Sequence, residues 1–168
     1  MRVYLIGYMF SGKTTVGRKL AAKLGFQWLD LDQVFECYYH TTIPIFFKKY
    51  GEEAFRKLEQ KLLHSTADLD DVVVSTGGGT PCYFDNIQWI NGQGKSVYFD
   101  VTEETLLRRA AQSKKPRPVL ASMTEEERGR YIHQQLSQRL PYYQKAHVIF
   151  PADQPDIDRL VMLITSAQ

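Results

Sequence analysis

One glycine-rich segment constrains this chain more than any other: residues 7–14 have the sequence GYMFSGKT, which fits the pattern G-x4-G-K-[ST]. The pattern needs a buried strand before it and a helix after it, and the apolar run at 3–6 and the amphipathic run at 13–24 provide both. Such a loop turns its backbone N–H groups onto an anion at the positive end of the helix dipole. Lys13 would then reach the β- and γ-phosphates of ATP, and the Thr14 hydroxyl would face Mg²⁺. The alternative is a glycine-rich turn capped by Thr14, with Lys13 in solvent.

The charge balance limits the classes of partner. Twenty-one Lys and Arg residues face nineteen Asp and Glu, a net charge of +2 over 168 residues, whereas nucleic-acid-binding proteins usually carry a clustered basic excess. The apolar residues at the N-terminus are too few for a signal peptide, and no apolar run approaches the length of a membrane span. We therefore expect one domain over residues 1–168, cytoplasmic, with neither a nucleic-acid nor a membrane partner.

Strand and helix signals alternate along the chain. Strands are expected at 3–6, 26–29, 72–75, 96–99 and 147–150. Helices are expected at 13–24, 51–65, 84–90, 102–111 and 124–140, with a turn at Asn91-Gly92 and a last helix whose first turn contains Pro155. This alternation predicts an α/β fold in which a five-stranded parallel sheet carries helices on both faces. Ligands bind at the carboxyl ends of such strands, where both glycine-rich segments, 7–12 and 77–79, are expected.

Residues 112–123 interrupt the alternation. The segment has few apolar residues to anchor it and contains Lys114, Lys115, Pro116, Arg117 and Pro118. We expect it to be a mobile lid.

Two carboxylates follow the second strand, on the same edge of the sheet as the phosphate-binding loop. The residues alone leave two interpretations open. Asp30 is suited to cap the next helix and Asp32 to lie in its first turn, where the dipole favours acids. A carboxylate near Mg²⁺ would equally orient an acceptor hydroxyl and take its proton.

Three arginines also allow two interpretations. Arg56 has Glu52 and Glu59 one turn away on either side, as in a surface ion pair. Arg139 would be favoured at the C-terminal end of a helix by the dipole, and Arg117 could be a solvated loop cation. Their joint presence with a phosphate-binding loop instead favours a small anionic substrate.

Six motifs, in this order, resemble those of the shikimate kinase family and together span nearly the whole chain: GYMFSGKTT (7–15), DLD (30–32), FRKLE (55–59), STGGGTP (75–81), RPVL (117–120) and RLPYY (139–143). Gluconate kinases and adenylate kinases share the loop but not this combination. The resemblance implies a monomer with the three-layer P-loop NTPase fold and a mobile lid. It also implies ATP-dependent phosphorylation of the 3-hydroxyl of shikimate, assisted by Mg²⁺, in the pathway to chorismate and aromatic amino acids.

The resemblance further implies a role for each matching residue on the nucleotide side. It assigns ATP binding to Phe10, Ser11, Gly12, Lys13, Thr14, Thr15, Arg109 and Arg117. Arg109 would stack on adenine, and Arg117 would close over ATP from the lid. Thr14 would hold Mg²⁺, and Asp30 would hold it through a water molecule.

On the acceptor side, the resemblance assigns shikimate binding to Asp32, Arg56, Gly77, Gly78, Gly79 and Arg139. Arg56 and Arg139 would grip the substrate carboxylate, a role suited to the guanidinium fork, and Glu59 would orient Arg56. Gly78 would allow the backbone to approach the substrate closely, where a Cβ would obstruct it. The implied catalytic residues are Lys13, Asp32 and Arg117.

Phe10 departs from the family pattern, which usually has glycine at this position. A bulky ring there would alter the rim of the loop, the closure of the lid or the KM for ATP. Two other functions stay open on the sequence. One is a related kinase with another acceptor, such as gluconate, and the other is a non-catalytic nucleotide-binding protein.

Overall fold

The centre of the fold is a parallel β-sheet. The structure, a computed structural model, describes residues 1–114 and 117–166. The strands are β1 (Arg2–Ile6), β2 (Gln27–Asp30), β3 (Val72–Ser75), β4 (Lys95–Asp100) and β5 (Val148–Pro151). They lie in the order β2-β3-β1-β4-β5, with Arg2 opposite Val72 and Val3 opposite Lys95 on the two sides of β1. The predicted α/β fold with a five-stranded parallel sheet is confirmed.

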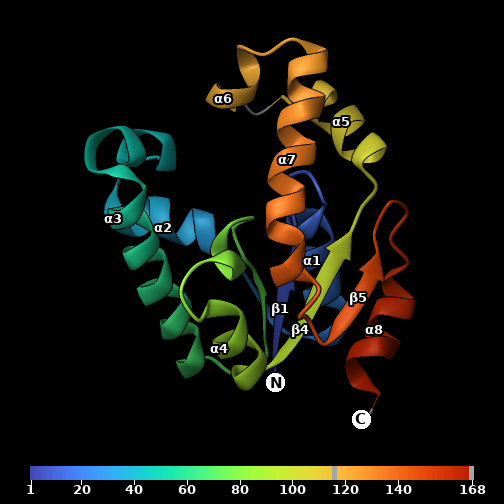
Figure 1. The fold of residues 1–168 in the computed structure, drawn as a ribbon. Helices are drawn as coiled ribbons and strands as arrows, with labels where there is room; N and C mark the ends of the chain where they lie inside the picture. Colours follow the sequence, from blue (N-terminus) through green and yellow to red (C-terminus); the bar gives the residue numbers. More distant parts are fainter. Residues whose placement is uncertain (115–116, 167–168) are drawn as a thin grey trace.

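Helices cover both faces of this sheet (Figure 1). They are α1 (Lys13–Leu24), α2 (Leu31–Tyr39), α3 (Ile43–Ser65), α4 (Asn86–Gln93), α5 (Glu103–Gln112), α6 (Pro118–Ala121), α7 (Glu125–Tyr143) and α8 (Ile157–Thr165), with short 3-10 turns η1 (Thr66–Asp68) and η2 (Thr80–Cys82). None of the helices in the described ranges combines the length and the apolar character needed to cross a membrane.

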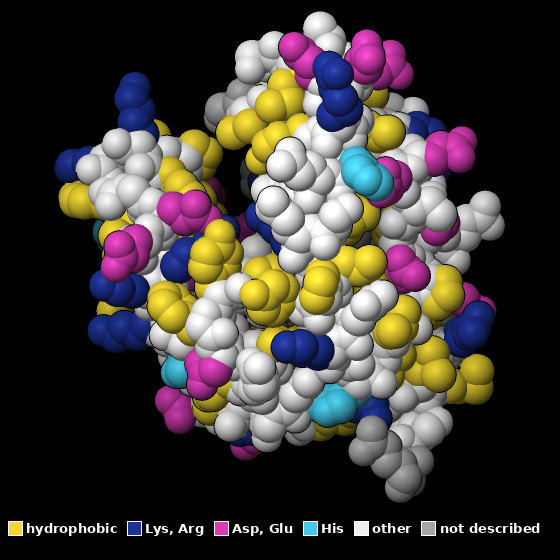
Figure 2. Space-filling model, viewed as in Figure 1, with side chains coloured by type: hydrophobic (Ala, Val, Ile, Leu, Met, Phe, Trp, Pro, Cys, Tyr) yellow, Lys and Arg dark blue, Asp and Glu magenta, His cyan; other side chains and the backbone are white. Residues whose placement is uncertain are grey.

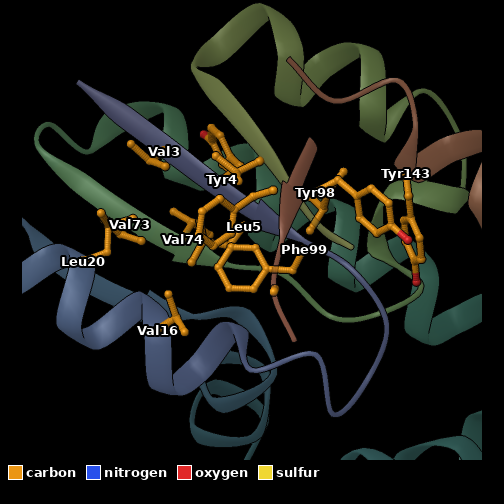
Figure 3. Packing of buried hydrophobic residues seen from close by; sticks show 14 of the residues in the cluster. Val3, Tyr4, Leu5, Val16, Leu20, Val73, Val74, Tyr98, Phe99 and Tyr143 are labelled. Atoms are coloured by element: carbon orange, nitrogen blue, oxygen red, sulfur yellow. The ribbon is translucent and has the colours of Figure 1, made fainter. Parts of the chain in front are cut away.

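Successive side chains of the central strand β1 face opposite layers, because side chains alternate along a strand. Leu5 lies against Gly17 of α1, so close that a Cβ on Gly17 would be 3.1 Å from the Leu5 side chain. Tyr4 points the other way, and its ring meets that of Trp89 in α4 with centroids 6.1 Å apart. Figure 3 shows the side chains packed on the two sides of the strands. The buried sheet therefore has the two covering layers that its apolar strands require.

A second, smaller apolar cluster lies between α2 and α3. It is formed by the buried rings of Phe35, Phe46 and Phe55, which meet at steep angles. Helix α3 begins at Ile43, eight residues before the predicted start, with the Thr42 hydroxyl accepting from the backbone N–H of Ile45. Gly51, with φ 84°, kinks it, and this kink is why the helical pattern before position 51 was missed.

Two other boundaries differ from expectation. The predicted turn at Asn91-Gly92 is wrong, because α4 continues to Gln93 while Ile87 and Ile90 are buried beneath it. The last helix starts at Ile157 with Asp156 as its cap, so Pro155 precedes the first turn rather than lying in it. In both places the local turn or proline signal was weaker than the packing and capping around it.

Helix α7 carries the predicted capping box. Thr124 and Glu127 exchange hydrogen bonds of 3.2 and 2.8 Å between side chain and backbone at its start. The helix continues past Leu140, where it was expected to end, to the buried ring of Tyr143. Between α5 and α7, the expected lid at 112–123 contains the short helix α6; its residues 115–116 lie outside the described ranges. The lid's mobility stays a prediction.

Candidate active site

A cavity of about 670 Å³ opens at the carboxyl ends of β1, β2 and β3. Figure 2 shows the molecule hollowed between the α2–α3 segment and α7. All of the predicted site residues except Arg109 line this cavity: Phe10, Ser11, Gly12, Lys13, Thr14, Thr15, Asp30, Asp32, Arg56, Gly77, Gly78, Gly79, Arg117 and Arg139. Motifs far apart in the sequence therefore meet at one edge of the sheet.

The phosphate-binding loop follows β1 and ends in α1. Gly12 takes φ 91° as the residue before the helix, a conformation that suits glycine. The Lys13 side chain is buried, and its Nζ donates to the carbonyls of Gly7 and Tyr8 at 2.7 and 2.9 Å. Burial lowers the pKa of Lys13 to about 8, although the nearby carboxylates of Asp32 and Asp30 oppose this shift. The ammonium form therefore prevails at neutral pH.

Asp30 performs two tasks at the end of β2. Its Oδ1 accepts from the backbone N–H of Asp32 at 3.0 Å and thereby caps α2. Its Oδ2 accepts from the Thr14 hydroxyl at 3.0 Å, across from the start of α1. The helix-capping interpretation of Asp30 is thus correct, and it does not exclude a role at the phosphates.

These two oxygen-bearing side chains fit Mg²⁺. The cation prefers oxygen ligands and is usually held by one or two carboxylates together with substrate phosphates and water. Within the described ranges no group of three or more His, Cys, Asp or Glu side chains could enclose a metal by itself. A site shared between Thr14, Asp30 and the phosphates of a nucleotide is the arrangement that these residues allow.

Asp32 lies in the first turn of α2 and, like Asp30, is partly buried. Its Oδ1 is so near the backbone of Gly77 that a Cβ there would be 2.8 Å away. Desolvation, with repulsion from the carboxylates of Asp30 and Glu59, raises the pKa of Asp32 to about 6. Lys13 and Arg117 act in the opposite direction and favour the charged form. A carboxylate with such a pKa is well matched to accepting a proton near neutral pH.

Arg56 is buried, so the surface ion pair is not the right description of it. Its Nη1 donates to Glu59 Oε1 at 2.9 Å, and its Nε and Nη2 lie 3.3 Å from Glu52 Oε1. The guanidinium also lies 4.1 Å from the centre of the Tyr83 ring. Glu59 is itself buried and accepts from the Thr80 hydroxyl at 2.8 Å. The fork is therefore held rigidly at the cavity wall.

Each glycine of the segment 77–79 lies against a charged side chain. A Cβ on Gly79 would be 2.5 Å from Arg56 Nη2, and one on Gly77 would meet Asp32 and Glu59 at 2.8 and 3.1 Å. A Cβ on Gly78 would be 3.1 Å from Arg139 Nη1. These approaches are to side chains of the protein itself, and the close approach of a substrate to Gly78 stays a prediction.

Arg139 lines the cavity from α7, and Tyr143 of the same helix contacts the triple-glycine segment beside it. The Arg139 guanidinium lies 5.6 Å from the centre of the Tyr8 ring, and it takes part in none of the ion pairs formed within the described ranges. One turn further on, the Tyr143 hydroxyl donates to the Gly78 carbonyl at 2.5 Å, and its ring stacks on Tyr98. The Tyr143 contact was missed, because the helix was expected to end before it.

Arg109 is the predicted site residue that lies outside the cavity lining. Its Nη1 donates to the Phe10 carbonyl at 3.0 Å, and its Nη2 donates to the carbonyls of Ala152 and Asp153 at 3.2 and 3.1 Å. These bonds tie the phosphate-binding loop to the segment after β5. Its stacking on adenine stays a prediction.

An apolar wall of the cavity was also missed. It consists of residues from the first turns of α3 and from beyond its kink: Ile43, Pro44, Phe47 and Phe55. The available signal was Thr42, a helix-capping residue directly before an apolar run. The wall faces the arginines and carboxylates, so the cavity suits a ligand with both an apolar framework and charged or hydroxyl groups.

Comparison with known proteins agrees with this geometry. A family model described as shikimate kinase matches residues 9–166. A shikimate kinase of Phocaeicola vulgatus is 44% identical over 160 residues, covering 95% of this chain and 91% of that protein. The crystal structure of a shikimate kinase from Bacteroides thetaiotaomicron superposes with a TM-score of 0.95 at 39% identity, covering 99% of both chains. A shikimate kinase from Acinetobacter baumannii, solved in complex with shikimate, gives a TM-score of 0.85 at 34% identity, covering 97% of this chain and 92% of that one.

Proposed function

The chain belongs to the shikimate kinase family and is a phosphotransferase with an alcohol acceptor, and we propose that its cavity carries out ATP + shikimate → ADP + shikimate 3-phosphate by the roles given below. One observation carries the proposal: a buried Arg56 fork, an Arg139 outside the described ion pairs and an Asp32 carboxylate line the same cavity as the phosphate-binding loop. A nucleotide-binding protein without an acceptor would have no use for that second group of residues.

On the nucleotide side, the backbone N–H groups of residues 10–15 and the Lys13 ammonium bind the phosphates. The charge that spreads over the transferring phosphoryl group is stabilised by Lys13 and by Arg117. Thr14, and Asp30 through a water molecule, would hold Mg²⁺, which when bound would supply positive charge to offset that of the phosphates. The oxygen chemistry of Thr14 and Asp30 supports this part of the proposal.

On the acceptor side, Arg56 and Arg139 bind the shikimate carboxylate and the triple-glycine backbone approaches the ring. Asp32 receives a hydrogen bond from the reacting hydroxyl and accepts its proton. The raised pKa of about 6 supports this role, because the carboxylate is still ionised at neutral pH yet basic enough to bind a proton. A lid closing over ATP excludes water, which would otherwise hydrolyse ATP. We propose a monomer that acts in the cytoplasm.

A coupled assay tests the proposed reaction. Purified protein is mixed with ATP and Mg²⁺ and either shikimate or gluconate, and the release of ADP is followed. We expect release that depends on shikimate and not on gluconate. Gluconate-dependent release would indicate a related kinase with another acceptor, and no acceptor-dependent release from folded protein would indicate a nucleotide-binding protein.

Arg56→Lys tests the acceptor site. We expect the KM for shikimate to rise about tenfold, because an ammonium cannot form two parallel bonds to a carboxylate. The KM for ATP should stay unchanged. Lys57→Ala, at an exposed neighbour whose ammonium pairs with Glu53, is the matched control. A change in the KM for ATP rather than for shikimate would place Arg56 outside the acceptor site.

A further inference from the structure

Phe10 holds a backbone conformation that bulky residues seldom adopt. Its φ is 67°, in the left-handed region, where the Cβ of any residue other than glycine is crowded by the backbone. Strained residues of this kind persist only where their surroundings hold them, and they are concentrated at functional sites. Phe10 lies in the middle of the phosphate-binding loop and lines the cavity, so the question is what its ring does there.

The backbone of Phe10 is fixed from one side by Arg109. That guanidinium donates to the Phe10 carbonyl at 3.0 Å and is itself held by the carbonyls of Ala152 and Asp153. These bonds anchor residue 10 to the segment after β5. Groups of the protein itself therefore hold the backbone from which the Phe10 ring projects.

The ring of Phe10 meets Arg117. The centre of the Arg117 guanidinium lies 5.6 Å from the ring centroid, within the range in which a cation is attracted to an aromatic face. Arg117 belongs to none of the ion pairs in residues 1–114 and 117–166, and its buried Nε has no hydrogen-bond partner among them. An arginine without a carboxylate partner keeps its charge available to an incoming anion.

We propose that Phe10 is a positioning residue whose ring holds the Arg117 guanidinium at the mouth of the phosphate-binding loop before ATP binds. The proposal rests on the proposed function, in which Arg117 contacts the transferring phosphoryl group. If only part of the free protein holds the arginine in place, the apparent affinity for ATP falls by that fraction. A ring that raises the fraction lowers the KM for ATP without contributing to the chemical step.

The first test is Phe10→Leu, which keeps a Cβ and an apolar side chain at the strained position but removes the aromatic face. We expect the KM for ATP to rise roughly two- to fivefold, the range that a cation–π contact at a partly exposed site supports. The kcat should be unchanged, and Phe10→Tyr should restore the KM. A loss of folded protein would instead lower kcat and leave the KM as it was.

The second test asks whether Phe10 acts through Arg117. The affinity for Mg²⁺·AMP-PNP is measured by calorimetry for the unaltered protein, Phe10→Leu, Arg117→Ala and the double variant. We expect Phe10→Leu to weaken binding in the protein that keeps Arg117. In the protein that carries Arg117→Ala, Phe10→Leu should have no further effect. Equal effects in both backgrounds would overturn the proposal, because the ring would then act on the nucleotide or the loop itself.

The chain offers a matched control for the strained backbone. Phe84 also has a positive φ, 52°, and its side chain is 53% exposed, but it does not line the cavity. Phe84→Leu should leave AMP-PNP affinity unchanged. Since AMP-PNP binding needs no acceptor, these measurements stay informative even if shikimate-dependent turnover is not found, which separates failure of this proposal from failure of the proposed function.

Discussion

Lys13→Ala is expected to lower kcat/KM for ATP by about a thousandfold, with shikimate as the acceptor. The ammonium is the buried cation of the phosphate-binding loop, and an alanine leaves the charge of the transferring phosphoryl group without this partner. Release of ADP in the coupled assay measures the effect, and the circular dichroism spectrum should stay that of the folded protein. Lys19→Ala, an exposed lysine of the same helix, is the matched control and should retain full activity.

The pH dependence offers a second check on Lys13. Its pKa of about 8 predicts that kcat/KM falls as the pH rises through that value, because the ammonium loses its proton. Turnover that stays constant well above pH 8 would show that the charge of Lys13 is not needed. Activity of Lys13→Ala close to that of the unaltered protein would remove Lys13 from the machinery altogether.

Asp32→Asn is expected to reduce phosphoryl transfer by about a hundred- to ten-thousandfold, the range associated with the loss of an acid–base group. An amide keeps the size of the side chain but cannot accept the proton of the hydroxyl. Affinity for Mg²⁺·AMP-PNP should stay largely intact. Asp68→Asn, at an exposed carboxylate in η1, serves as the control for charge removal. Loss of nucleotide affinity would instead assign Asp32 to the nucleotide side.

The raised pKa of Asp32 predicts a loss of activity at acidic pH. It also predicts that the charged carboxylate, which activity requires, lowers the stability of the folded state. Because the folded-state pKa of Asp32 is about 6 against an ordinary 3.8, kcat/KM should fall as the pH drops through 6. A raised carboxyl pKa stabilises the folded state below the unfolded pKa, and this contribution is lost as the pH rises through 6. At neutral pH the buried charge therefore costs on the order of 3 kcal/mol, and Asp32→Asn should raise the free energy of unfolding by a similar amount. Urea denaturation at pH 7 measures it, and a less stable variant would contradict the expected burial of charge.

The sheet and the phosphate-binding loop could be predicted because each depends on local patterns. Apolar runs define the strands, and the loop residues Gly12 and Lys13 act within a few positions of one another. Capping at Thr102 and Thr124 is equally local, and both hydroxyls accept the expected backbone hydrogen bonds. The family resemblance then brought Asp32, Arg56 and Arg139 to the same site, where the cavity now contains all three.

What could not be predicted depends on contacts between distant segments. Helix α3 consists of two helical runs on either side of Gly51, and the sequence pattern indicated only the second. The part of the apolar cavity wall that includes Phe47 lies on the first run and was therefore missed. The bond from Tyr143 to the Gly78 carbonyl spans 65 positions and follows from a helix end that Pro141 obscured. The three carbonyls that Arg109 binds belong to the phosphate-binding loop and to the segment after β5. No sequence motif indicates these contacts.

The crowding at the triple glycine has a consequence for anyone who wishes to change the acceptor. A side chain at position 77 or 79 would push against Asp32 or Arg56, the groups proposed to hold the hydroxyl and the carboxylate. A mutant library spread over this loop would therefore consist mostly of inactive clones, however conservative each replacement looks on paper. The apolar wall at Ile43 and Phe47 borders the same cavity with side chains that can be made smaller. Selection for an enlarged or altered acceptor should begin with codons 43 and 47 and leave 77 and 79 untouched.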